Sequence, residues 1–126
     1  MAAPVIAQGV VIGVLVAKLS NDEIDNVVTG NRRWRQEGFG DTGGAYLVGP
    51  DYLARSGPRA FYENRDNFFA DLKSVGASDE EIAAIQRYGT PVLHQRVDTK
   101  ASRAALASVE GTGEIIGYRG VPTLAS

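Results

Sequence analysis

The first third of the chain pairs one long apolar run with one amphipathic segment. Val10 to Leu19 is dense in β-branched residues, and its apolar side chains occupy both odd and even positions. A strand with that pattern must be covered on both of its faces. Ser20 and Glu23 then form a capping box, which predicts a short helix that Gly30 ends. The apolar face expected of this helix consists of Ile24, Val27 and Val28.

The middle of the chain predicts a tight hairpin. Two short apolar segments, Ala45 to Val48 and Tyr52 to Arg55, flank Gly49-Pro50-Asp51. Proline fixes φ and aspartate favours turns, so this tripeptide suits a reversal of the chain between two antiparallel strands.

Two helices are predicted after the hairpin. A stripe of apolar residues at near-helical spacing leads to Gly76, where the first helix should end. Ser78 and Glu81 form a second capping box, and Gly89 lies just beyond the expected end of the second helix. The residues expected to be buried are Phe61, Phe68, Leu72 and Val75 in the first stripe and Ile82 and Ile85 in the second.

The C-terminal third predicts a strand, a helix and a second hairpin. Pro91 to Val97 has moderate strand character, and Asp98 or Thr99 can cap the alanine-rich helix that follows. Glu114 to Tyr118 and Val121 to Ala125 have the composition of paired strands. Two hairpins imply an antiparallel sheet, with the helices grouped against it rather than interleaved one per strand. The predicted fold class is therefore α+β.

Composition and charge limit the classes of function. At 126 residues the chain suits one domain with a core plus an appendage, and 44% hydrophobic with 22% charged residues is ordinary for a globular protein. A formal net charge of −2 provides no basic field for nucleic acid. The arginines around Trp34, at 32, 33 and 35, are therefore expected to lie in a solvated loop. Without cysteine, neither a disulfide nor a thiolate metal site can form.

The apolar stretch from Val5 to Leu19 is not expected to cross a membrane. Gln8, Gly9, Gly13 and Lys18 interrupt it, and it falls short of the ~20 residues that a spanning helix needs. It also lacks the basic start and the cleavage site of a signal peptide. Any membrane anchor would therefore lie outside this chain.

A glycine cluster matches a nucleotide-binding pattern in spacing but not in context. Gly38, Gly40 and Gly43 follow G-x-G-x-x-G, and Glu63 lies near the distance expected of a ribose-binding acid. In dinucleotide-binding domains such glycines follow a strand and open a helix that holds the pyrophosphate. Here the polar segment Asn31 to Glu37 precedes the cluster and a predicted strand follows it. We therefore expect no nucleotide cofactor.

The segment Gly43-Gly-Ala-Tyr-Leu-Val-Gly-Pro-Asp51, followed by Arg55-Ser56, carries a family resemblance. Further landmarks are Gly89-Thr90, Gln95, Val97-Asp98-Thr99, Gly111-Thr112 and Tyr118-Arg119-Gly120-Val121-Pro122. In this order they resemble the Cache family of extracytoplasmic sensor domains, which commonly carries "TGETYLVGPDG" and then a strand ending near "RS". The resemblance covers about Gly13 to Pro122. Gly44 stands where the family often has glutamate.

This resemblance implies a PAS-like antiparallel sheet flanked by helices, in bacterial transmembrane receptors such as adenylate or guanylate cyclases and sensor kinases. Residues 1–30 would then be an N-terminal strand and helix that end a distal module or form a linker. Residues 31–126 would be the sensor domain, truncated at its C-terminus because such domains continue through at least one more strand. An amino-acid-sensing subset of the family carries Arg-x-Trp-Tyr. Arg35 replaces that tyrosine here, so we do not infer the same specificity.

No set of residues predicts catalysis. His94 is the single histidine and has no cysteine or paired carboxylates at ligand spacing, so a structural role is favoured over a metal site. Asp79, Glu80 and Glu81 follow a helix cap, where negative charge stabilises the helix N-terminus. The serines lie in caps, turns or helices and none has a G-x-S-x-G context. An enzyme, a cofactor and a metal are therefore not expected.

Six side chains are candidates for contact with a small-molecule ligand. Arginine clamps a carboxylate with two parallel hydrogen bonds, and tyrosine offers a hydroxyl on an apolar ring. The candidates are Tyr46, Arg55, Tyr62, Arg65, Tyr88 and Tyr118, with Trp34 as a possible apolar wall. The alternative is that the tyrosines pack as core residues and the arginines lie in water.

The sequence therefore predicts an extracytoplasmic ligand-sensing domain that passes a conformational change to a cytoplasmic output domain of a membrane-anchored parent. The alternative is a receptor module that spaces or dimerises its parent and has no ligand of its own. Because Val10 to Leu19 needs a neighbour, we expect it to join the sheet of this chain or of a second copy, and we expect a homodimer.

Overall fold

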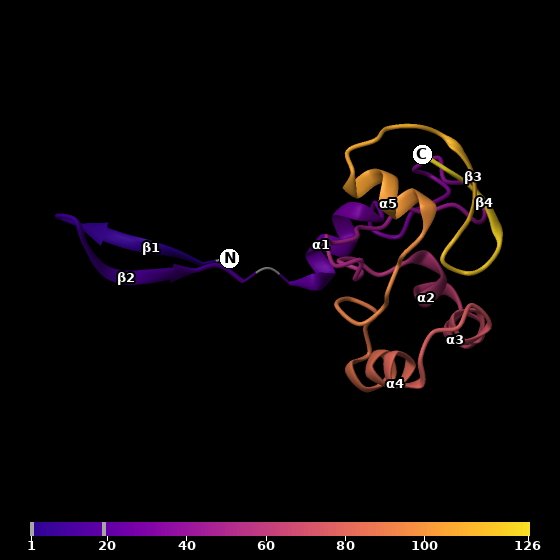
Figure 1. The fold of residues 1–126 in the computed structure, drawn as a ribbon, viewed down its shortest axis with the longest axis horizontal. Coiled ribbons are helices and arrows are strands. Elements are labelled where there is room, and N and C mark those ends of the chain that lie inside the picture. Colours follow the sequence, from indigo (N-terminus) through magenta and orange to yellow (C-terminus); the bar gives the residue numbers. More distant parts are fainter. Residues whose placement is uncertain (1, 19) are drawn as a thin grey trace.

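The described residues contain five helices and two small antiparallel sheets, so the protein is of the mixed α/β class (Figure 1). The computed structural model describes residues 2–18 and 20–126. The elements are β1 (Ala2–Ala7), β2 (Val10–Val16), α1 (Asn21–Val28), α2 (Arg59–Glu63), α3 (Arg65–Ser74), α4 (Asp79–Tyr88), α5 (Lys100–Leu106), β3 (Gly113–Ile116) and β4 (Pro122–Ala125). The predicted mixture of helices and antiparallel strands is confirmed, but the described strands form two separate hairpins rather than one sheet with the helices grouped against it.

The N-terminal strands form a hairpin that projects from the rest of the chain (Figure 1). Gln8 and Gly9 have positive φ angles of 50° and 77°, which suits the tight turn between twisted strands. Every residue of β1 and β2 is exposed. The prediction that this apolar strand would join the sheet of its own chain was therefore wrong, and cover by a second copy of the chain stays a prediction. The strand pairs instead with β1, which the sequence did not predict; Leu19 lies outside the described residues.

Helix α1 begins where predicted, but a different face is buried. The Ser20 hydroxyl accepts a hydrogen bond from the backbone N–H of Asp22 at 3.2 Å, and the helix ends at Thr29. Val27, expected on the apolar face, is 83% exposed, whereas Asp25 is 2% exposed. The helix is oriented by polar contacts of Asp25 with the loop before α2, and periodicity alone could not reveal these contacts.

Helices α2, α3 and α4 enclose the main core. It consists of Phe61, Phe68, Leu72 and Ile85, all predicted to be buried. The helical stripe is broken at Asn64, whose side chain accepts from the N–H of Asn67 at 3.0 Å and starts α3. Val75 is 46% exposed, contrary to the prediction, because it is the residue at which α3 ends.

The remaining predicted caps are present. Ser78 accepts a hydrogen bond from the N–H of Glu81 at 3.1 Å at the start of α4, and Gly89 ends that helix at φ 67°. Thr99 and Ser102 form a capping box at the start of α5. The hairpin of β3 and β4 follows, and its turn carries Tyr118 back against the core. These elements place the residues of the candidate site.

Candidate functional site

The chain reverses at residues 45–55 as predicted, but the two predicted strands are reduced to a single bridge, and a third segment joins them. Val48 and Ala54 pair in an antiparallel bridge, and the N–H of Arg55 donates to the carbonyl of Leu47 at 2.8 Å. Leu53 forms a second antiparallel bridge with Arg96. The segment Pro91 to Val97, predicted as a strand, therefore contributes a bridge rather than a full strand. This short ribbon forms the base of the site.

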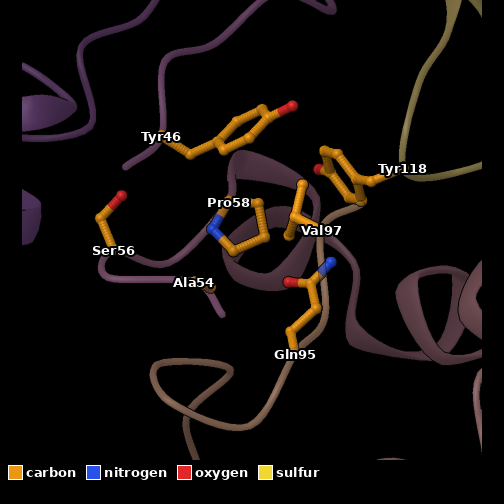
Figure 2. Close-up of a pocket in the computed structure, with 7 residues that line it drawn as sticks. All are labelled: Tyr46, Ala54, Ser56, Pro58, Gln95, Val97 and Tyr118. Atoms are coloured by element: carbon orange, nitrogen blue, oxygen red, sulfur yellow. The ribbon is translucent and has the colours of Figure 1, made fainter. Parts of the chain in front are cut away.

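A small cavity lies between this ribbon and the turn of the C-terminal hairpin (Figure 2). The pocket is partly open to solvent, and the space between its walls is too narrow to admit a water molecule. The residues that line it are Tyr46, Ala54, Ser56, Pro58, Gln95, Val97 and Tyr118. They come from three parts of the chain, so the cavity exists only when the ribbon and the C-terminal hairpin are in contact.

Gln95 is the least expected residue of this cavity. Its side chain is fully buried, yet neither Nε2 nor Oε1 has a hydrogen-bond partner among the described residues. Figure 2 shows its amide pointing toward the side of the cavity where Tyr118 lies. An unpaired buried polar group costs about 1–3 kcal/mol. Native proteins seldom bear this cost without a reason, so the unpaired amide is the most unusual feature of this cavity.

Two tyrosines form the opposite side of the cavity. The rings of Tyr46 and Tyr118 meet edge to face, with centroids 5.4 Å apart at 82°. Burial raises the pKa of Tyr46, and a hydrogen bond with Thr99 acts in the opposite direction. Burial also raises the pKa of Tyr118, and the charge of Arg119 opposes that shift. Both hydroxyls therefore stay protonated at neutral pH and can donate or accept hydrogen bonds.

The hydroxyl of Ser56 is held in place by the backbone. It is buried and accepts a hydrogen bond from the N–H of Leu47 at 2.8 Å. The neighbouring N–H of Gly57 donates to the carboxylate of Asp25 at 2.7 Å. Asp25 also accepts from the hydroxyl of Tyr62. The wall of the cavity is thus tied directly to helix α1.

The structure brings two of the six predicted ligand residues together, Tyr46 and Tyr118. The other four lie outside the cavity lining. Their side chains have other contacts: Arg55 binds the carboxylate of Asp51 at 2.8 Å, Tyr62 binds Asp25, Arg65 lies 4.5 Å over the ring of Phe61, and Tyr88 stacks on His94 at 4.6 Å. Trp34, the suggested apolar wall, is buried under Arg59 instead, at 5.0 Å.

Gln95 and Ser56 were not predicted as site residues, although both belong to the landmarks of the family resemblance. One signal could have identified Gln95. It is an amide in a segment whose neighbours Pro91, Val92 and Val97 are apolar. A polar side chain at a position that the pattern reserves for the core calls for a partner, and none is evident nearby in the sequence.

Replacing Tyr118 by phenylalanine should change the stability of the chain in alkaline solution. The folded pKa of Tyr118 is raised above the unfolded value of about 10, so the unfolded state loses its proton first as pH rises. The contribution of Tyr118 is complete below about pH 10 and falls by about 1.4 kcal/mol per pH unit above it. Urea denaturation should give parallel curves for parent and Tyr118→Phe below about pH 9 and a shallower decline for the variant above about pH 10. Equal slopes in both ranges would contradict this assignment.

Comparison of the chain with protein-family models, with curated proteins and with solved structures gave no match. Within the part of the chain that the structure describes, no helix is both long and apolar enough to cross a membrane.

Proposed function

We propose that this chain is an extracytoplasmic ligand-sensing domain of a bacterial transmembrane receptor, and that it binds a small molecule in the cavity at Gln95. The observation that carries the proposal is the fully buried amide of Gln95, which has no partner among the described residues. The Cache resemblance supports it independently. Five of the seven lining residues belong to landmark segments of that resemblance: Tyr46, Ser56, Gln95, Val97 and Tyr118.

A PAS-like arrangement is part of the proposal. Two antiparallel bridges, between Val48 and Ala54 and between Leu53 and Arg96, join three segments into one ribbon beside the core helices. The C-terminal hairpin closes over this ribbon through Tyr118. Such a layout provides a ribbon face partly closed by other elements, where a ligand can be enclosed.

Signal transmission would follow from the way the cavity walls are attached. Gly57 lies between two lining residues and is bonded to Asp25 of α1, the helix that leads from the N-terminal hairpin. Next to Tyr118, the guanidinium of Arg119 binds the carboxylate of Asp71 in α3 at 2.6 Å. A ligand that separates the walls would change both attachments. It would signal to the extent that it binds one arrangement more tightly than the other.

A thermal-shift screen with amino acids, organic acids, amines and neutral amides tests the proposal. A ligand at a hundred times its Kd adds about 2.7 kcal/mol, or roughly 10 °C in melting temperature for a domain of this size. Gln95→Met should abolish the shift without destabilising the ligand-free chain, because the amide has no partner to lose. Gln86→Met, at an exposed position on α4, should keep it. If no class of compound raises the melting temperature, the sensing proposal fails.

A second candidate is a dimerisation module without a ligand, favoured by the exposed apolar hairpin. Eight large hydrophobic residues of the hairpin are exposed: Val5, Ile6, Val10, Val11, Ile12, Val14, Leu15 and Val16. Open strand edges of this kind invite pairing with another chain. The ligand screen separates the two candidates, because only the sensing domain gains stability from a small molecule, and a series of protein concentrations tests dimerisation in either case. A dimer melts at a higher temperature when the protein is more concentrated, whereas a monomer does not.

A further inference from the structure

The lining of the cavity is uncharged. Its polar groups are two phenols, one hydroxyl and one amide, and the other three residues are apolar. The arginines next to lining residues along the chain are paired with carboxylates outside the lining. Arg55 pairs with Asp51 at 2.8 Å, Arg59 with Glu63 at 2.8 Å, Arg96 with Asp98 at 3.1 Å and Arg119 with Asp71 at 2.6 Å. A charged ligand would have to leave water without a counter-ion, which is strongly unfavourable.

The Gln95 amide defines the polar groups that a ligand must present. It offers a carbonyl acceptor beside an N–H donor, and neither is used within the described residues. The complementary group carries a donor beside an acceptor in one plane. This requirement holds for either orientation of the amide, because rotating it by half a turn exchanges the two positions.

We propose that the cavity binds an uncharged molecule with a carboxamide-type edge, as in a primary amide, a urea or a lactam, paired to the side-chain amide of Gln95. This inference rests on the proposed sensing function and narrows its ligand class. A carboxylate presents acceptors alone and would leave Oε1 of Gln95 unpaired. An amidinium presents donors alone and would leave its Nε2 group unpaired. Sites built for hydrogen bonding reject ligands that leave buried groups without partners.

The size of the cavity restricts the ligand further. The space between the lining residues is too narrow for even one water molecule, far below the volume of sites for drug-sized compounds, so only a small ligand suits it. No water fits between the lining residues, so a wall must move before a ligand can enter. Tyr118 is the lining residue that comes from the C-terminal hairpin, so separation of that hairpin from the ribbon would open the cavity. Tyr118 lies in a turn between Gly117 and Gly120, where the backbone of Gly120 has φ 76° and the N–H of Gly120 donates to the carbonyl of Gly117 at 2.9 Å.

Three small isosteric compounds test the inference directly: acetamide, acetate and acetamidinium. Each is titrated into ¹⁵N-labelled protein while the side-chain NH₂ signals of glutamine are followed by NMR. Acetamide should shift the Gln95 signals saturably, and the other two should bind at least about tenfold more weakly. Gln95→Met should lose the acetamide response at the backbone signals of Tyr46 and Tyr118. Gln86→Met, which changes an exposed glutamine, should retain it.

The outcomes separate this inference from the proposed function. If acetate or acetamidinium shifts the pocket signals as well as acetamide does, the cavity is a ligand site and the neutral-amide class is wrong. If acetamide responds equally in the parent and in Gln95→Met, pairing to Gln95 is wrong. If none of the three compounds shifts the pocket signals, the amide inference is overturned, and the sensing proposal is then decided by the wider thermal-shift screen. The comparison of the three compounds uses the parent protein alone, so it holds even where the variant fails to fold.

Discussion

Replacing Phe68 by alanine should lower the free energy of unfolding by about 3–5 kcal/mol, a large share of the total stability of a small domain. Phe68 is completely buried, and its ring meets those of Phe61 and Phe69 edge to face, each at 5.4 Å. Truncation removes the apolar surface of the ring and leaves a cavity in the packed core. Urea denaturation followed by circular dichroism measures the change.

Phe39→Ala is the matched control. Phe39 lies in the loop before the ribbon and is 37% exposed, so the same truncation should cost roughly 1–2 kcal/mol. A loss for Phe68→Ala no greater than that for Phe39→Ala would show that the four-residue core does not dominate stability. The Phe68→Ala substitution should also alter the cavity at Gln95. Tyr118 packs against this core, so a collapsed core should shift the wall that closes the cavity.

The features that the sequence predicted well depend on neighbours within a few positions. The caps at Ser20, Ser78 and Thr99 each accept a hydrogen bond from a backbone N–H two or three residues on. The buried positions Phe68 and Leu72 lie one helical turn apart. Such patterns are set by local geometry, so composition and spacing contain the necessary information.

Features that depend on distant contacts were not predictable in the same way. Asp25 is buried because its partners, Gly57 and Tyr62, lie 32 and 37 residues further along the chain. Gln95 becomes part of a cavity through a bridge between segments about forty residues apart. A polar residue in the sequence does not reveal which distant segment it will contact. Burial of these two side chains was accordingly missed.

Arg55 shows how a local partner can remove a predicted site residue. It was expected to clamp a ligand carboxylate, but Asp51 supplies a carboxylate from four positions earlier, in the turn of the same hairpin. The guanidinium also donates to the carbonyl of Leu53 at 3.1 Å. An arginine that follows an aspartate at this spacing across a tight turn should be tested for that pairing before a ligand is assigned to it.

The apolar hairpin shows a limit of pattern analysis of another kind. Apolar residues at both parities of β2 predicted cover on both faces, and the strand itself formed. The pattern indicates that cover is required and contains no information on what supplies it. Within residues 2–18 and 20–126, every position of the hairpin strands is exposed. If these strands pair with a second copy of the chain, their apolar side chains would be covered, and the melting temperature would rise with protein concentration.

Asp25→Ala should lower the free energy of unfolding by about 3 kcal/mol, because it removes the acceptor for two donors at once. The N–H of Gly57 is buried and would lose its partner, and so would the hydroxyl of Tyr62. Tyr62→Phe removes one of those bonds and should cost roughly 1.5 kcal/mol. Asp22→Ala, at an exposed position in the first turn of α1, should cost no more than about 1 kcal/mol.

The double variant Asp25→Ala with Tyr62→Phe should cost less than the sum of the single variants, because the two share one hydrogen bond. Strict additivity in urea denaturation would show that the Asp25–Tyr62 contact contributes nothing.

The same variants test the proposed route by which ligand binding in the cavity affects α1. Asp25 does not line the cavity, yet it fixes Gly57 between two residues that do. If that attachment links α1 to the cavity, Asp25→Ala should reduce the acetamide response at Tyr46 while Asp22→Ala preserves it. An unchanged response in a folded Asp25→Ala chain would place the route to α1 elsewhere.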